Sequence, residues 1–274
     1  MDLRIALACW GFPRGDSIAE RMEARARRGG EEGASMLVFP ECLMHTAPPS
    51  PRSAAACAEP LTGPFVTQAR KLARTFHVAL VVPMYETAPE GGLPYNTCVV
   101  IDEAGEIVCS YRKCHLYDAH GVSETDITRS GDELAPVFDI AGARVSLGIC
   151  YDLRFAEVAR SAALDGADLM LFPAAWHEGP GKRLHWETLL RARAIENEFF
   201  CCGVCHMGAR YVGVSLVAGP TGEDVGLREC ASSTGEHLLW LADLDLTRVA
   251  AARQSMDILS HRRPELYGVL TQGR

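Results

Sequence analysis

The strongest constraint on the fold is that strand-like and helix-like segments alternate along the whole sequence. Short runs rich in apolar and β-branched residues predict strands, and segments with apolar residues at helical spacing predict helices. The expected strands are 4–9, 35–39, 78–83, 95–101, 107–111, 137–140, 144–149, 169–172, 199–204, 213–218 and 237–241. The expected helices are 16–28, 61–76, 155–165, 184–198 and 246–253. This alternation is typical of an α/β protein.

The alternation runs through residues 1–274 without a repeat, a low-complexity tract or a linker, so we interpret the chain as one domain. The strands are too numerous and too mixed for a simple doubly wound sheet. A hydrophobic fraction of 48% is ample for a packed core. The connection 114–134 is long, polar and irregular. Because such loops inside a compact domain are usually functional, we expect it to lie near a site.

Charge and composition exclude several classes of partner. The formal net charge of −8 argues against nucleic acid, because phosphate binding needs clustered Lys and Arg. The apolar run 5–10 is too short for a signal peptide, and the run 167–176 is too short and too interrupted for a membrane span. Eleven cysteines without an export signal indicate a reducing compartment. We therefore predict a cytoplasmic protein with no nucleic-acid or membrane partner.

Three expected strands deliver an ionisable residue at their ends. Glu41 and Lys113 each come just past an apolar strand, and Cys150 stands at a sharp junction between a strand and the next helix. Strand ends and their loops are where α/β proteins gather catalytic groups. A thiol beside a base and a cation, near a helix N-terminus, has its thiolate form favoured and becomes a usable nucleophile.

Each of these residues has an ordinary structural explanation when it is taken alone. A glutamate after a strand is usually a solvated turn residue or a helix cap, and a single cysteine is usually part of the core. The three positions gain their meaning from the residues that flank them and from their order in the chain.

The flanking residues form an ordered set of motifs. The main motifs are Phe39-Pro-Glu41, Tyr111-Arg-Lys113-Cys-His-Leu116 and Gly148-Ile-Cys150-Tyr-Asp-Leu-Arg-Phe155. Further matches are Tyr95-Asn-Thr97, Arg191-Ala-Arg-Ala-Ile-Glu-Asn197, Gly213-Val-Ser215, Pro220-Thr-Gly222 and Arg262-Arg-Pro-Glu-Leu-Tyr267. In this order, and over essentially the whole chain, the set resembles the nitrilase superfamily of carbon–nitrogen hydrolases.

The resemblance implies a division of catalytic roles. Glu41 would be the general base and Cys150 the nucleophile that attacks the amide carbon. Lys113, with the backbone N–H of Tyr151, would stabilise the oxyanion. Glu124 matches the second glutamate of the superfamily, which orients the lysine and the substrate, although an ordinary loop carboxylate is the alternative for this position.

The resemblance also implies an architecture. It predicts an α-β-β-α sandwich that assembles as a homodimer or a higher homo-oligomer. The reaction would need no metal or cofactor, because all the required charge is carried by the protein and no ligand cluster has metal spacing.

Function follows from the context of the nucleophile. The sequence Cys150-Tyr-Asp152 resembles the ω-amidase and related amidase branches, which implies cleavage of a small linear amide through a thioester, with release of ammonia. An N-carbamoyl amino acid hydrolase or a nitrilase with the same triad is the alternative. From other classes come a catalytically idle binding protein and a redox or haem protein.

Three further residues are expected to contact substrate, namely Tyr151, Arg154 and Trp176. If the helix after Cys150 begins near residue 152, Arg154 falls in its first turn, where its guanidinium could hold a substrate carboxylate. The alternative is that Arg154 pairs with a structural acid, either Asp152 or Glu157. Trp176 is expected on a loop at the mouth of the pocket. A carboxylate clamp would favour short dicarboxylic acid monoamides such as succinamate.

Two other patterns are interpreted as structural. The spacing of His45, His115 and His120 fits no zinc template, so we expect them in the core or in loops. The run Cys202-Gly-Val-Cys205-His206 fits the c-type haem attachment pattern, but it lies in an apolar strand. We therefore interpret it as a chance match.

Overall fold

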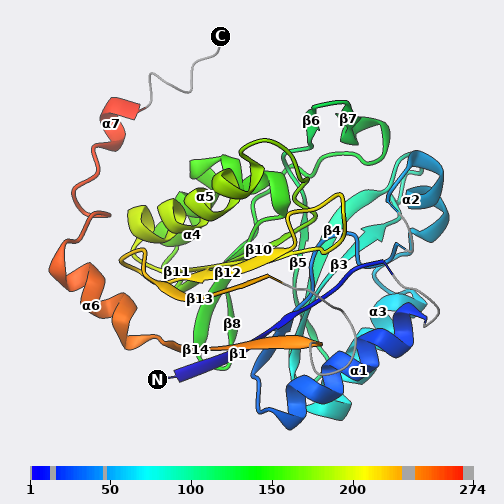
Figure 1. Cartoon of the computed structure of the whole chain (residues 1–274), viewed down its shortest axis with the longest axis horizontal. Coiled ribbons are helices and arrows are strands. Elements are labelled where there is room, and N and C mark those ends of the chain that lie inside the picture. The colour runs from blue at the N-terminus through cyan, green and yellow to red at the C-terminus, as the bar shows by residue number, and fades with distance from the viewer. Residues whose placement is uncertain (1, 13–16, 46–47, 230–237, 268–274) are drawn as a thin grey trace.

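Two six-stranded sheets pack face to face, and helices cover both outer faces, which gives the four layers α-β-β-α of a single α/β domain (Figure 1). The computed structural model describes residues 2–12, 17–45, 48–229 and 238–267. The predicted α-β-β-α sandwich is therefore confirmed. Within the described residues, no helix is both long and apolar enough to cross a membrane.

The first sheet has the strand order β14-β1-β2-β3-β4-β5. Its strands are β1 (Asp2–Ala8), β2 (Met36–Val38), β3 (Ala79–Glu86), β4 (Tyr95–Ile101), β5 (Ile107–Arg112) and β14 (Leu239–Asp245). Strands β1, β2 and β3 are parallel, and the remaining pairs are antiparallel. The parallel strands therefore end at the same edge of this sheet.

The second sheet repeats this plan with the order β13-β12-β11-β10-β9-β8. Its strands are β8 (Phe138–Ile140), β9 (Ala143–Leu147), β10 (Leu169–Ala174), β11 (Phe200–Cys205), β12 (Val214–Ala218) and β13 (Asp224–Glu229). Strands β9, β10 and β11 are parallel. Every residue of β10 and β11 is buried, as expected for parallel strands covered on both faces.

The helices fall into two layers and a C-terminal extension. Their bounds are α1 (Ile18–Glu31), α2 (Pro51–Cys57), α3 (Pro64–Phe76), α4 (Ala156–Leu164), α5 (Lys182–Asn197), α6 (Thr247–Ser255) and α7 (Pro264–Tyr267). Helices α1 and α3 lie outside the first sheet, α4 and α5 lie outside the second, and α6 and α7 run away from the sandwich (Figure 1). A capping box between Ser17 and Glu20 begins α1.

Alternation along the strands separates two hydrophobic cores. In β1, Ile5 and Leu7 belong to the core between the sheets, whereas Ala6 and Ala8 belong to the core under α1 and α3. Successive side chains of a strand point to opposite faces, so a single strand contributes to both cores. The sheets are thereby fixed relative to each other and to their helices.

The main differences from the predicted elements lie in polar segments. Neither helix α2 nor strand β13 was predicted. The long connection 114–134 contains the short hairpin of β6 (Asp118–Ala119) and β7 (Val122–Ser123), followed by a 3₁₀ turn over Glu124–Asp126. The expected strand 237–241 begins at a residue outside the described part, and β14 covers the rest of it.

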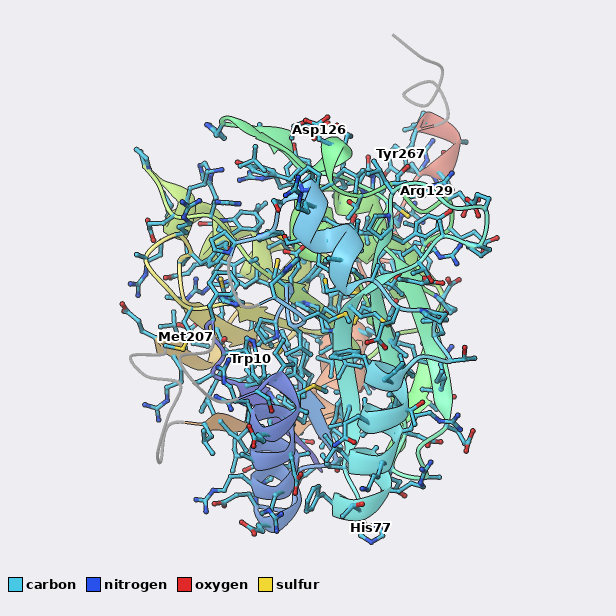
Figure 2. All side chains as sticks on the ribbon, turned by 90° about the vertical axis from the view of Figure 1, so that its right-hand side faces the viewer. Trp10, His77, Asp126, Arg129, Met207 and Tyr267 are labelled. Carbon is cyan, nitrogen blue, oxygen red and sulfur yellow. The ribbon has the colours of Figure 1, made fainter. Side chains whose placement is uncertain are left out.

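The two ends of the sandwich differ in character. Asp126, in the 3₁₀ turn after β7, lies at one end of the molecule, and His77, which ends α3, lies at the other (Figure 2). The end near Asp126 is the one where loops from both sheets meet, and the candidate site lies there.

Candidate active site

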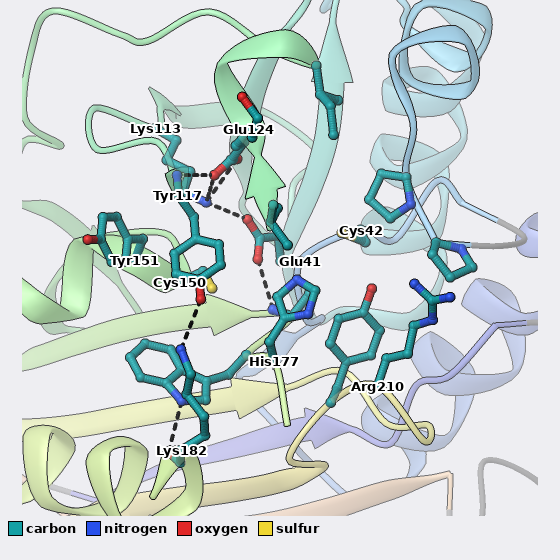
Figure 3. Close-up of a pocket in the computed structure, with 18 of the residues that line it drawn as sticks. Glu41, Cys42, Lys113, Tyr117, Glu124, Cys150, Tyr151, His177, Lys182 and Arg210 are labelled. Carbon is teal, nitrogen blue, oxygen red and sulfur yellow. Dashed lines mark hydrogen bonds and ion pairs between the residues drawn. The ribbon is translucent and has the colours of Figure 1, made fainter. Parts of the chain in front are cut away.

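A cavity of about 280 Å³ opens where strands of both sheets end. Glu41 follows β2, Lys113 follows β5, Cys150 follows β9 and Trp176 follows β10. All four residues line the cavity, together with Glu124 from the 3₁₀ turn after β7 (Figure 3). The ionisable residues predicted at the ends of strands are therefore close together in the structure, although they come from distant parts of the chain.

Glu41 is held on both of its carboxylate oxygens. Its Oε1 accepts hydrogen bonds from Lys113 Nζ at 2.9 Å and Asn96 Nδ2 at 2.7 Å, and its Oε2 accepts one from the backbone N–H of Ala175 at 2.8 Å. Burial raises the pKa of Glu41. The positive charge of Lys113 and its hydrogen bond, together with hydrogen bonds from the Ala175 backbone and the Cys150 thiol, outweigh burial and leave the pKa below its usual value. Glu41 is therefore a carboxylate at neutral pH.

Lys113 lies buried between two carboxylates. Its Nζ is 2.9 Å from Glu41 Oε1 and 2.8 Å from Glu124 Oε2. Burial lowers the pKa of Lys113, but Glu124 and Glu41 raise it more, and the pKa ends well above its usual value. Glu124 in turn accepts hydrogen bonds from Asn96 Nδ2 at 3.2 Å and from the backbone N–H of Tyr117 at 2.7 Å. Glu124 therefore fixes the position of the ammonium group.

Cys150 begins a 3₁₀ turn, Cys150–Arg154, with a backbone φ of +47°. A positive φ costs energy for any residue other than glycine, and such strain is typical of functional sites. Gly148 makes the close approach before the turn, because a Cβ there would lie 2.9 Å from Phe172 Cε1. The sharp turn leaves the Cys150 side chain in the wall of the cavity beside Glu41.

Asp152 braces this turn. It is fully buried, and its Oδ2 accepts hydrogen bonds from the backbone N–H of Ile149 and the hydroxyl of Tyr111, both at 2.8 Å. Its Oδ1 lies 3.1 Å from the backbone N of His115 and 2.7 Å from its Nδ1. Because Tyr111 belongs to β5, the strand that leads to Lys113, Asp152 ties the nucleophile's turn to the strand that carries the ammonium.

We expect Asp152→Asn to lower the free energy of unfolding by about 1–3 kcal/mol, because an amide NH₂ then faces donors and leaves buried groups unsatisfied. Urea denaturation measures the change. Tyr111→Phe serves as the comparison: it removes one donor to Asp152 and the acceptor of the Cys114 backbone N–H, leaves the other contacts of Asp152 in place, and should cost less. An Asn variant as stable as the wild type would show that these contacts add no net stability.

The protonation state of Cys150 differs from the expectation drawn from the sequence. Burial raises the pKa of the thiol well above its usual value, the carboxylates of Glu41 and Glu124 raise it further, and Lys113 offsets only part of this. The expected stabilisation of the thiolate by a cation and a helix N-terminus is therefore wrong for the unliganded site. The resting pair is a neutral thiol that donates to an ionised Glu41.

Arg154 and Trp176 both occupy positions that differ from expectation. Helix α4 begins at Ala156, so Arg154 lies in the preceding 3₁₀ turn and not in the first turn of an α-helix. In the described part of the chain, no carboxylate lies within ion-pair distance of Arg154, and its guanidinium stacks over the Trp176 indole, 4.6 Å from the ring centroid. Trp176 lies on the loop after β10, as expected, but it is buried in the cavity wall and not at the mouth.

Tyr151, the remaining residue predicted to contact substrate, also lines the cavity. Its ring packs edge-on against Tyr117 and lies 6.0 Å from the guanidinium carbon of Arg154. Together, the aromatic rings make part of the cavity wall apolar, and those of Tyr117 and Tyr151 lie close to Cys150 (Figure 3).

The histidines and the haem-like cysteine pattern have structural positions. His45 is buried, which lowers its pKa to about 4, and His120 lies in the turn between β6 and β7. Cys202 and Cys205 are buried in β11 with free thiols. Across residues 2–12, 17–45, 48–229 and 238–267, no group of three or more His, Cys, Asp or Glu side chains is placed to hold a metal ion.

Sequence reasoning assigned no role to Asn96, Tyr117 or Lys182, all of which belong to the site. Asn96 in β4 donates hydrogen bonds to both Glu41 and Glu124. It lies in the motif Tyr95-Asn-Thr97, to which the sequence analysis assigns no role. Tyr117 accepts a hydrogen bond from Lys182 Nζ at 2.9 Å. The one sequence signal for Lys182 was the scarcity of lysine in the chain.

The cluster has the parts needed for nucleophilic attack on an electrophilic carbon. A carboxylate base lies beside a neutral thiol, and an ammonium whose pKa is raised lies beside both. Transfer of the thiol proton to Glu41 would generate the nucleophile only as it attacks, and Lys113 would stabilise negative charge that develops on the substrate.

Comparisons with known proteins agree with this chemistry. The family model described as carbon–nitrogen hydrolase matches residues 14–254. The deaminated glutathione amidase of Escherichia coli O157:H7 is 32% identical over 249 residues, which cover 89% of this chain and 91% of that protein. The omega-amidase of Homo sapiens is 31% identical over 253 residues, covering 89% of this chain and 88% of its own length.

Solved structures give the same result. An amidase from Nesterenkonia sp. superposes with a TM-score of 0.79 at 29% identity, covering 98% of this chain and 96% of that chain. The NitFhit protein of C. elegans gives a TM-score of 0.84 at 29% identity, covering 97% of this chain and 66% of its own. One structure of the Nesterenkonia amidase carries the acetamide moiety of fluoroacetamide on its active site cysteine.

Proposed function

This chain belongs to the carbon–nitrogen hydrolase family and is an amidase, and we propose that it hydrolyses a small linear amide through a thioester on Cys150, with release of ammonia. The observation that carries the proposal is the pairing of a buried thiol, whose pKa is raised, with Glu41, whose pKa is lowered. A neutral nucleophile beside an ionised base is the state from which general-base attack begins.

The first half of the reaction forms the thioester. Glu41 takes the thiol proton as Cys150 Sγ bonds to the amide carbon, and the carbonyl oxygen becomes an oxyanion. Lys113 and the backbone N–H of Tyr151 stabilise that charge, while Glu124 holds Lys113 in place. Glu41 then returns the proton to the amide nitrogen, the C–N bond breaks, and ammonia leaves.

The second half releases the acid. Glu41 removes a proton from a water molecule that attacks the thioester carbon, and the same two donors stabilise the second oxyanion. The C–S bond then breaks, and Cys150 recovers its proton from Glu41. Two pKa shifts support this route. The lowered pKa of Glu41 keeps the base ionised, and the raised pKa of Lys113 keeps the ammonium charged before each attack.

The substrate class follows from the charges of the cavity. We propose that the acyl part of the amide carries a free carboxylate and that Arg154 binds it. The guanidinium lines the cavity, is stacked on Trp176, and has no carboxylate partner among the described residues. The names of the omega-amidase and deaminated glutathione amidase relatives support this class. Short dicarboxylic acid monoamides such as succinamate fit it.

Arg154→Lys tests the carboxylate contact. We expect the KM for succinamate to rise about tenfold, because lysine keeps the charge and loses the bidentate geometry. The KM for butyramide, a neutral amide of similar length, should change much less. Steady-state ammonia release measures both values. Equal losses on the two amides would assign Arg154 a structural role.

A substrate screen tests the proposed activity as a whole. Purified wild-type protein should release ammonia from primary amides faster than from N-carbamoyl amino acids or nitriles of the same chain length. A preference for carbamoyl compounds or nitriles would overturn the amide assignment and leave the Cys150 thioester route in place. Failure to acylate Cys150 with any of the three classes would overturn the proposed mechanism.

A further inference from the structure

Lys182 is a buried ammonium without a counter-charge. Its side chain lines the active-site cavity, the residue is 8% exposed, and Nζ donates a hydrogen bond to the Tyr117 hydroxyl at 2.9 Å (Figure 3). Within the part of the chain that the structure describes, no Asp or Glu oxygen lies within 4.0 Å of Lys182 Nζ. Lys113, the other lysine of the cavity, has two carboxylate partners.

The start of α5 adds positive potential at the position of Lys182. Lys182 is the first residue of α5, where the unpaired N–H groups of the helix already give a positive potential. Charged side chains that are buried without a partner are costly, so stability alone gives no reason to place an ammonium there. An anion bound in the cavity would supply the missing charge.

The composition of the chain sets this residue apart. Only three of the 27 Lys and Arg residues are lysines, namely Lys71, Lys113 and Lys182. Lys71 is exposed on α3, and the other two line the cavity. A sequence that otherwise uses arginine for nearly all of its positive charge has lysine, a compact point charge, at both of these buried positions in the cavity wall.

Trp176 connects Lys182 to Arg154. The indole Nε1 donates to the backbone carbonyl of Lys182 at 2.9 Å, and the guanidinium of Arg154 lies over the same indole. Both residues therefore contact the same buried side chain, Lys182 through its backbone carbonyl and Arg154 through its guanidinium, and neither has a carboxylate partner among the described residues. Tyr117 connects Lys182 to the catalytic cluster, because its hydroxyl contacts Lys182 and its backbone N–H donates to Glu124.

We propose that Lys182 is a specificity-determining residue that, together with Arg154, binds a carboxylate on the acyl part of the substrate. The inference rests on the proposed function in one respect: when the leaving group is ammonia, the carboxylate must belong to the acyl part. Monoamides of short dicarboxylic acids are the substrate class that places an amide at Cys150 and an anion at Lys182.

The test compares succinamate with butyramide in the full-length protein. We expect Lys182→Met to lower the ratio of kcat/KM for succinamate to that for butyramide by roughly 30-fold or more, as loss of one partner of a desolvated charge pair does. Lys182→Gln, which keeps a polar group near Tyr117, should lower the ratio similarly. Lys71→Met, the exposed control, should keep the wild-type ratio.

Binding of the product analogue succinate separates this inference from the proposed function. Calorimetry on Cys150→Ala should detect succinate binding that Lys182→Gln weakens at least tenfold, whether or not any amide is turned over. Equal losses on both amides, or undiminished succinate binding in the Gln variant, would overturn the role of Lys182 while wild-type amide hydrolysis stands. An inactive wild type that binds succinate through Lys182 would instead overturn the proposed function alone.

Discussion

Cys150→Ala and Cys150→Ser should each abolish ammonia release while leaving the fold intact. Alanine removes the nucleophile, and serine replaces the thiol with a hydroxyl whose pKa is much higher. Glu41, with its lowered pKa, is too weak a base to activate that hydroxyl. We expect a fall in kcat on the order of 10⁴-fold or more, as when a nucleophile is deleted from a preorganised site.

The fold should tolerate both changes, because the side chain removed is small and lies in the cavity wall. The loss of stability should be about 1 kcal/mol, the scale for one or two buried heavy atoms. Ammonia assays measure the activity, and thermal unfolding measures the fold. Mass spectrometry after iodoacetamide treatment, with and without succinamate, reports whether Cys150 is reactive and shielded by substrate. Substantial ammonia release by purified Cys150→Ala would show that Cys150 is not the nucleophile.

The framework of the site was predictable because it depends on strands. Glu41, Lys113 and Cys150 each follow a strand whose apolar pattern is clear, and parallel strands end at a common edge. The sandwich followed from the resemblance, since two sheets with covered outer faces do not arise from periodicity alone. The residues that hold the site, such as Asn96 and Asp152, act through contacts between segments far apart in the chain.

What sequence reasoning missed depends on burial and on local backbone geometry. A nearby cation favours ionisation of the Cys150 thiol, but the sequence does not reveal that burial and two carboxylates act against it. Arg154 was placed in an α-helix that begins two residues later. The sequence also does not reveal that Lys182, at the start of α5, is buried with no Asp or Glu partner among the described residues.

Lys113→Met should lower the rate of acylation several hundredfold, because it removes about 3–4 kcal/mol of transition-state stabilisation. Its effect on substrate binding should be much smaller. A charged donor close to the developing oxyanion acts mainly in the transition state. The variant also leaves Glu41 and Glu124 buried without their shared ammonium, which is destabilising. The double variant Lys113→Met/Glu124→Gln restores the net charge of the cluster and controls for this loss, and Lys71→Met controls for removal of an exposed lysine.

The pH profile separates oxyanion stabilisation from a purely structural role. Lys113 is the main group that lowers the pKa of Glu41 against burial, so its removal raises that pKa. Activity needs the ionised carboxylate and is lost as pH falls through its pKa. The acidic limb of kcat/KM should therefore move to higher pH in Lys113→Met. Single-turnover acylation measured across pH on folded protein provides the test. A variant with the wild-type kcat and an unmoved acidic limb would make Lys113 a bystander, because neither the oxyanion nor the base would then depend on its charge.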